Sequence, residues 1–294
     1  MREAARPDLC RGEADDGGRE KGEGEELRLV QLPPRPRRRL RPQTRPEGRI
    51  GKVFHIRGLY LQDWIKDPTV PFVWRLNKKV AGSGSHGDLC AHSIDMLRYI
   101  TGDEFAEVCG IFNTFIKKRP EGRMLEGLTA GGSSTKGAKM ATVDVDDAVW
   151  FMAKTKAGAI GTFEATRFAT GHNNTNSLEI NGDKGSLKFD FPNFSFLEFF
   201  DDTLPPSEKG WRKISVTTGN HEYARNYWPA DHPIGYAETF TNTAADIAVH
   251  MADKKAKPSD FHANFEDGMA CQQVLEAVSR SAAEKRWVDV REIE

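Results

Sequence analysis

A chain of 294 residues can form one large domain or two ordinary domains, and its 42 basic and 43 acidic side chains leave a formal net charge of -1. This balance excludes a chain-wide field for nucleic acid or for a membrane surface. The four cysteines are scattered without a Cys-x-x-Cys pair, which indicates a reducing compartment and no thiolate zinc site. No apolar run approaches the roughly 18 residues of a membrane span and no signal-peptide core begins the chain, so we expect a cytoplasmic protein.

The first 49 residues differ in composition from the rest of the chain. They contain no Phe, Trp or Tyr, and Pro33 to Pro46 is mostly proline and arginine. Such a segment cannot bury enough apolar surface to offset its ordering entropy, so we expect residues 1–49 to be disordered. A nucleic-acid arm and an out-of-frame translation are the two alternatives. The run from Arg35 to Arg45 favours the arm, but acidic residues earlier in the segment nearly balance it.

From Gly51 the pattern is that of a folded domain, which we place at residues 50–294. Apolar, strand-forming stretches predict strands at 52–62, 105–116, 148–154, 159–168, 177–180, 186–191, 196–200 and 213–217. Residues 117–140 are expected to form a long Gly/Ser/Lys-rich loop. Helices are predicted from Gly87 to about Ile100, then late in the chain at 236–254 and 266–285. This order indicates an α+β fold, a mainly antiparallel open sheet with helices on one face.

The first predicted helix carries three polar residues on one face. Asp88, His92 and Asp95 are spaced i, i+4, i+7, and a carboxylate one turn from an imidazole can fix its tautomer and tune its pKa for proton transfer. The alternative is that Asp88 only caps the helix and His92 is a satisfied core histidine.

Two further patterns in this stretch are rejected. Gly82 to Gly87 fits the dinucleotide pattern G-x-G-x-x-G, but the preceding Arg75-Leu-Asn-Lys-Lys79 is not a buried strand. We therefore expect a tight, bare turn that lets another group approach the helix. His86, Asp88 and His92 could be taken for metal ligands, but one helical turn presents only Asp88 and His92 together, so no metal is expected.

The stretch is also similar to a family signature. The matching segments are Trp74-Arg75, Ala81 to Gly84, Gly87-Asp88-x-x-x-His92-x-x-Asp95, Phe265-Glu-Asp-Gly268 and Trp287-Val-Asp-Val290. They resemble the glucose–fructose oxidoreductase, inositol dehydrogenase and rhizopine-catabolism (Gfo/Idh/MocA) family. The resemblance implies an enzyme that oxidises a secondary alcohol of a sugar or polyol with NAD or NADP. It also implies an N-terminal Rossmann domain and a C-terminal sheet domain whose open face packs against a second subunit as a homo-oligomer.

The resemblance makes His92 the proton-transfer residue and Asp88 its carboxylate partner. Polar and aromatic residues near strand ends and helix starts are candidates for the substrate pocket, because sugar sites combine aromatic faces with charged donors. These substrate-binding candidates are Trp64, Arg75, Asp95, Arg167, His232 and Tyr236. For each of them, the alternative is an ordinary surface or loop residue.

One family motif is missing from the chain as written. The family's third catalytic residue is a lysine in a Glu-Lys-Pro motif at the end of the Rossmann domain, and this sequence has no such motif. We therefore expect only the substrate half of the enzyme here, no cofactor-binding residue in this chain, and no hydride transfer by the chain alone. A non-enzymatic sugar-binding or oligomerisation module is the alternative function.

A shifted reading frame explains the missing motif. Read one base on, with codons that the residues allow, Met1 to Asp15 becomes Cys-Glu-Lys-Pro-Leu-Ala-Leu-Thr-Phe-Ala-Glu-Ala-Lys-Gln. The same shift turns Gln31 to Pro36 into Asn-Tyr-Arg-Arg-Val, which is typical of the family before its sheet domain. We therefore expect the first 49 residues to be an out-of-frame translation of the end of the Rossmann domain.

Overall fold

The computed structural model describes residues 47–122, 137–221, 223–227, 229, 232–253 and 264–293. Residues 1–46, for which disorder and a shifted frame are predicted, lie outside the described residues. The predicted boundary after residue 49 is slightly too late, because Glu47–Ile50 forms a short helix, α2, whose last residue is buried. Ile50 also accepts a backbone hydrogen bond from Lys184, which ties α2 to the turn between two strands.

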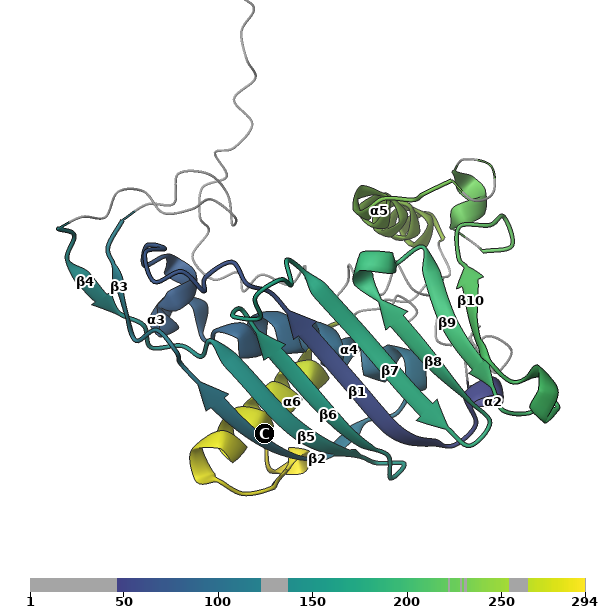
Figure 1. Cartoon of the computed structure of the whole chain (residues 1–294), viewed down its shortest axis with the longest axis horizontal. Helices are drawn as coiled ribbons and strands as arrows, with labels where there is room; N and C mark the ends of the chain where they lie inside the picture. Colours follow the sequence, from purple (N-terminus) through teal and green to yellow (C-terminus); the bar gives the residue numbers. More distant parts are fainter. Residues whose placement is uncertain are drawn as a thin grey trace, which may run out of the picture.

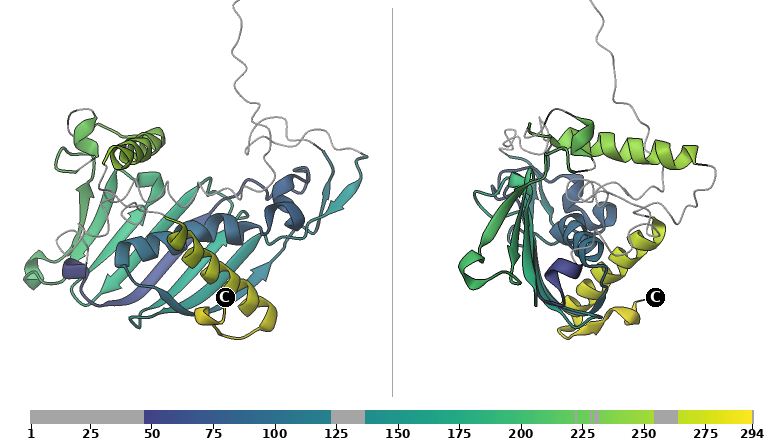
Figure 2. Two further views of the ribbon diagram at one scale, coloured as in Figure 1. Left: turned by 180° about the vertical axis from the view of Figure 1, so that it is seen from behind. Right: turned by 90° about the vertical axis from the view of Figure 1, so that its right-hand side faces the viewer.

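The predicted α+β fold is confirmed. A nine-stranded sheet has helices on one face (Figures 1 and 2), and its strand order is β10-β9-β8-β7-β1-β6-β5-β2-β11. The strands are β1 (Val53–Leu61), β2 (Phe105–Asn113), β5 (Ala148–Thr155), β6 (Ile160–Thr166), β7 (Thr175–Gly182), β8 (Gly185–Asp190), β9 (Phe196–Asp201), β10 (Trp211–Ser215) and β11 (Val288–Asp289). Two short strands within the predicted loop, β3 (Lys118–Pro120) and β4 (Met140–Thr142), pair separately.

The centre of the sheet differs from a simple meander. β1 precedes the other strands of the sheet in the sequence but lies in the middle of the sheet, antiparallel to β7 and parallel to β6. The other neighbouring pairs are antiparallel, so the sheet is mainly antiparallel as predicted. The parallel pair places the carboxyl ends of β1 and β6 side by side, because Leu61 is opposite Thr166.

The helices cover the side of the sheet that carries the apolar alternation. They are α3 (Lys78–Ala81), α4 (Ala91–Thr101), α5 (Tyr236–Ala252) and α6 (Phe265–Glu284), with a π-helical turn at His86–Cys90 and 3-10 turns at Trp74–Leu76, Phe191–Asn193, Pro206–Glu208, Ala224–Asn226 and Val290–Glu292. The main core lies between the sheet and α4 with α6. None of the helices among the described residues is long and apolar enough to cross a membrane.

A buried ion network fixes α4 against α6. The Arg98 guanidinium donates to both carboxylate oxygens of Glu104, at 2.7 and 2.9 Å, and to the Asp267 carbonyl oxygen at 3.2 Å. Asp267 also closes a capping box with Asn264 at the start of α6. Because a buried charge is costly unless it is paired, this network orients α4 and the residues that it presents.

Candidate active site

The glycine-rich turn before α4 encloses a carboxylate of the same chain. Asp146 accepts hydrogen bonds from the Gly84 backbone at 2.8 Å, the His86 backbone at 2.7 Å and the Ser85 hydroxyl at 2.7 Å. A Cβ atom on Gly84 would lie 1.7 Å from the Asp146 carbonyl oxygen, so only glycine fits there. The group that approaches this turn is therefore Asp146, and the turn leads directly into the π-helical turn that carries Asp88.

Asp88 lies between two arginines. It forms an ion pair with Arg167, whose side chain is only 2% exposed, and its carboxylate is 3.5 Å from the guanidinium of Arg75. The indole ring of Trp64 lies against Arg167, with 5.6 Å between the ring centroid and the guanidinium carbon. Trp64 and Arg167 follow the adjacent carboxyl ends of β1 and β6. The structure thus brings together four predicted site residues, Trp64, Arg75, Asp88 and Arg167.

His92 is buried one turn further along the helix. Its ring contacts the ring of Tyr60 edge to face, with 5.3 Å between centroids. Burial lowers the pKa of His92 to about 4, although the carboxylates of Asp88 and Asp95 act in the opposite direction. The imidazole is therefore neutral at pH 7, and its lowered pKa makes it a weaker base than an ordinary histidine.

Asp95 belongs to a different set of contacts from Asp88. Its carboxylate lies 3.9 Å from the guanidinium of Arg98, and the Cys271 thiol is 3.7 Å from the same oxygen. Asp95 is buried where α4 meets α6, and its charge acts on His92. Its assignment to substrate binding stays a prediction.

His232 and Tyr236 lie at the other end of the sheet. Tyr236 begins α5 and packs edge to face on Phe191, with 6.0 Å between ring centroids. The exposed ring of His232 bonds the Pro229 carbonyl oxygen at 2.9 Å. Figure 1 shows α5 beside β8 to β10, whereas α3 lies near the opposite end. The structure does not bring these two residues to Asp88, and their assignment also stays a prediction.

Two residues that hold the site were not predicted from the sequence. Asp146 lies in Val143-Asp-Val-Asp-Asp-Ala148, where only the density of carboxylates could have drawn attention to it. Arg119 is fully buried and donates to the backbone carbonyl oxygens of Ile65, Asp67 and Val70. It therefore supports the loop that carries Trp64, and no local pattern around Arg119 signals this role.

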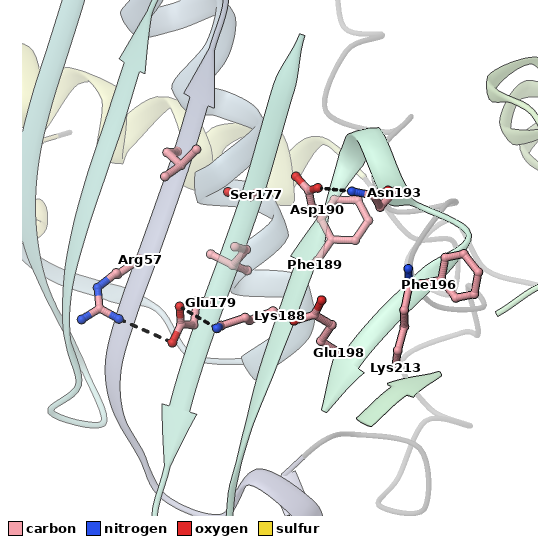
Figure 3. Close-up of a pocket in the computed structure, with 12 residues that line it drawn as sticks. Arg57, Ser177, Glu179, Lys188, Phe189, Asp190, Asn193, Phe196, Glu198 and Lys213 are labelled. Atoms are coloured by element: carbon pink, nitrogen blue, oxygen red, sulfur yellow. Dashed lines mark hydrogen bonds and ion pairs between the residues drawn. The ribbon is translucent and has the colours of Figure 1, made fainter. Parts of the chain in front are cut away.

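A second concave region lies on the opposite face of the sheet (Figure 3). A row of alternating charges crosses its strands: Arg57, Glu179, Lys188, Glu198 and Lys213 are neighbours in register. Arg57 and Lys188 lie 3.5 and 3.9 Å from the Glu179 carboxylate. This groove is separated from His92 by the sheet, so it is not part of the same site.

Residues 43–188 match the GFO/IDH/MocA C-terminal domain. The chain belongs to the Gfo/Idh/MocA family. It is 38% identical, over 252 residues, to levoglucosan dehydrogenase of Pseudarthrobacter phenanthrenivorans, an alignment that covers 84% of this chain and 62% of that protein. The family resemblance seen in the Asp88 to Asp95 segment is thereby confirmed.

Solved structures of related proteins agree with the fold. An oxidoreductase domain protein from Kribbella flavida superposes with a TM-score of 0.76 and 42% identity, covering 90% of this chain and 64% of that one. Levoglucosan dehydrogenase in complex with NADH and L-sorbose superposes with a TM-score of 0.73 and 36% identity, covering 83% and 60%. The chain thus spans 60% to 64% of the length of these relatives.

Proposed function

We propose that this chain supplies the substrate-binding domain, residues 50–294, of an NAD(P)-dependent dehydrogenase that oxidises a secondary alcohol of a sugar or polyol. The observation that carries this proposal is the buried, neutral His92 one helical turn from Asp88, which is paired with Arg167. Levoglucosan dehydrogenase, a relative over most of this chain, has been solved with NADH and with levoglucosan.

Each residue of the site has a role in this reaction. Oxidation of an alcohol requires removal of its hydroxyl proton, and the His92 imidazole is the neutral acceptor. Asp88 can stabilise the imidazolium that results, since an opposite charge nearby favours the protonated form. Arg75 and Trp64 offer a charged donor and an aromatic face for the remaining sugar hydroxyls.

The Gly82 to Gly87 turn does not fit a dinucleotide. The Gly82 to Gly87 turn has its backbone donors directed at Asp146, and a second anion beside that carboxylate would be repelled. This turn therefore does not hold the cofactor's phosphates. Hydride transfer would require NAD or NADP bound by another part of the complete enzyme.

The test is a His92→Ala variant in an enzyme form that contains a nucleotide-binding domain. With levoglucosan as substrate and NAD(P)H formation as readout, kcat should fall about 10²–10⁴-fold, the usual weight of a general base. His172→Ala is the matched control, because His172 is exposed on the turn before β7. Normal turnover by a folded His92→Ala enzyme would contradict the assignment.

The same measurement made on the chain alone addresses the alternative, a non-enzymatic sugar-binding module. Sugar binding without any change in NADH fluorescence, combined with wild-type turnover of the His92→Ala enzyme, would favour that module. We expect instead that the chain alone gives no NAD(P)H and that activity depends on His92 once the cofactor domain is present.

We further propose a homo-oligomer formed through the open face of the sheet, and a cytoplasmic location. Ile111, Met152 and Ile160 are large apolar side chains exposed on this face. The row of alternating charges in Figure 3 offers both signs of charge to a second copy of the same surface. The described cysteines Cys90, Cys109 and Cys271 are free thiols, which agrees with a reducing compartment.

A further inference from the structure

Asn176 is a buried amide without a hydrogen-bond partner. Its side chain is 0% exposed, and neither the nitrogen nor the oxygen of its carboxamide has a partner among the residues that the structure describes. It alternates with Leu178 and Ile180 along β7, so it points to the helix-covered, apolar side of the sheet. A buried carboxamide is costly when unpaired, and such a cost is usually retained for function.

Tyr60 connects Asn176 to His92. Asn176 is directly opposite Tyr60 in the antiparallel pair of β7 and β1, where the Cα atoms of facing residues are about 5 Å apart. The Tyr60 ring in turn contacts the ring of His92. β7 begins where β1 ends, since Thr175 pairs with Leu61, so Asn176 lies at the same sheet edge as Arg167.

The chemistry of a carboxamide fits a hydroxyl group. The amide offers two N–H donors and one acceptor oxygen, and a hydroxyl is at once a donor and an acceptor. An anionic ligand would use only the donors, and an apolar one would use neither. Sites that hydrogen-bond a substrate hydroxyl strongly reject analogues that lack it, because the protein's buried polar group is then unpaired.

We propose that the Asn176 carboxamide binds a hydroxyl group of the sugar substrate, next to the group that His92 deprotonates. The inference rests on the proposed function, and it adds a substrate contact that sequence analysis did not identify. A water molecule presents the same donor and acceptor, so the experiment has to distinguish an internal water from a sugar hydroxyl.

The test compares Asn176→Leu with the wild-type chain. Leucine has a similar size and removes the unpaired polar atoms, so Tm should rise by about 2–5 °C. Affinity for levoglucosan, measured by NMR titration, should fall about tenfold or more. Ser177→Ala is the matched control, because Ser177 is the next residue of β7 and lines the groove on the open face. It should change neither quantity.

A panel of monodeoxy analogues of levoglucosan adds a readout that a purely structural role would not change. The analogue that lacks the hydroxyl bound by Asn176 should bind the wild-type chain more weakly than levoglucosan does. The two ligands should bind Asn176→Leu with equal affinity. Unchanged levoglucosan affinity with a raised Tm would mean that the amide binds only water, and would overturn the inference. A lowered Tm would also overturn it, because the amide would then stabilise the fold. Absence of binding of levoglucosan and of every other sugar or polyol in a panel by the wild-type chain would contradict the proposed function itself.

Discussion

The carboxylate of Asp88 is paired with the guanidinium of Arg167, although 79 positions separate them in the chain. Arg167 comes from the end of a central strand, and Asp88 comes from the turn that opens α4. The pair therefore joins the sheet to the helix at the candidate site. Arg167 is buried in this pair, whereas the side chain of Asp88 is 19% exposed.

Replacing Arg167 should destabilise the fold as well as weaken sugar binding. Arg167→Met removes the buried partner of Asp88, and breaking such a pair from one side costs about 3 kcal/mol in the free energy of unfolding. Urea unfolding measures this change. Arg57→Met is the control, since Arg57 pairs with Glu179 on the exposed face and should cost less than about 1 kcal/mol. Equal costs for the two variants would contradict the structural role of the Asp88–Arg167 pair.

Asp146 should be needed for the glycine turn. Asp146→Ala leaves the buried backbone N–H groups of Gly84 and His86 without their acceptor, which costs about 3 kcal/mol of unfolding free energy. The control is Asp144→Ala two residues earlier, whose carboxylate accepts one exposed backbone bond from Lys78. It should cost about 1 kcal/mol, the usual net contribution of one hydrogen bond. If Asp144→Ala were the more damaging change, the enclosure of Asp146 by the turn would not be important for stability.

Stability should fall as pH is lowered from about 6.5 towards about 4. Burial lowers the pKa of both His86 and His92 to about 4 in the folded chain, against about 6.5 when unfolded. In this window the unfolded chain binds more protons, so each histidine contributes a slope of up to about 1.4 kcal/mol per pH unit. Burial raises the pKa of Asp147, which acts in the opposite direction at the acid end.

Urea unfolding at several pH values measures this slope. His86→Phe should remove about half of the slope between pH 5 and pH 6, because it removes one of the two buried histidines. Phenylalanine suits this position, since the ring of His86 already packs on Phe112, 4.8 Å away between centroids. His172→Ala, on the surface, should leave the slope unchanged. A stability that rose on acidification to pH 5 would show that these histidines are not buried as described.

The open face of the sheet should determine the oligomeric state. Ile111 is 65% and Met152 46% exposed on neighbouring strands, and a charge at either position would have to be desolvated in a face-to-face assembly. We expect Met152→Glu to shift the protein to monomers in sedimentation velocity. Val249→Glu is the control, because Val249 is also apolar and is even more exposed, at 70%, but lies on α5. A wild-type chain that is already monomeric at high concentration would contradict the proposed assembly.

Local patterns were sufficient to predict most elements of the fold. The hairpin turns, the alternation in β5 to β8 and the caps of α6 are encoded within short windows, and the predicted strands and late helices match the structure within a few residues. Windows of this length contain no information on which strand pairs with which. The parallel pairing of β1 with β6 was therefore not predicted, although it is what places Trp64 beside Arg167.

In the candidate site too, local contacts were predicted and long-range contacts were not. Asp88 and His92 share a helix face, so their proximity follows from spacing. Asp146 reaches the site from the loop before β5, 60 positions or more from the turn that it meets, and a single sequence has no signal for contacts across such distances. For Asp95, the helical spacing predicted the correct face of the helix. It did not predict that the Asp95 carboxylate would lie near Arg98.

The central place of β1 has a consequence for synthesis on the ribosome. His55 pairs with Ile160 on one side and with Asn181 on the other. Both edges of β1 therefore stay unpaired until β6 and β7 have been translated. Until then an apolar strand with unpaired edges is available to other nascent chains. Non-local pairing of this kind slows folding and exposes the intermediate to aggregation, so the yield of this protein should depend on chaperones that shield its early strand.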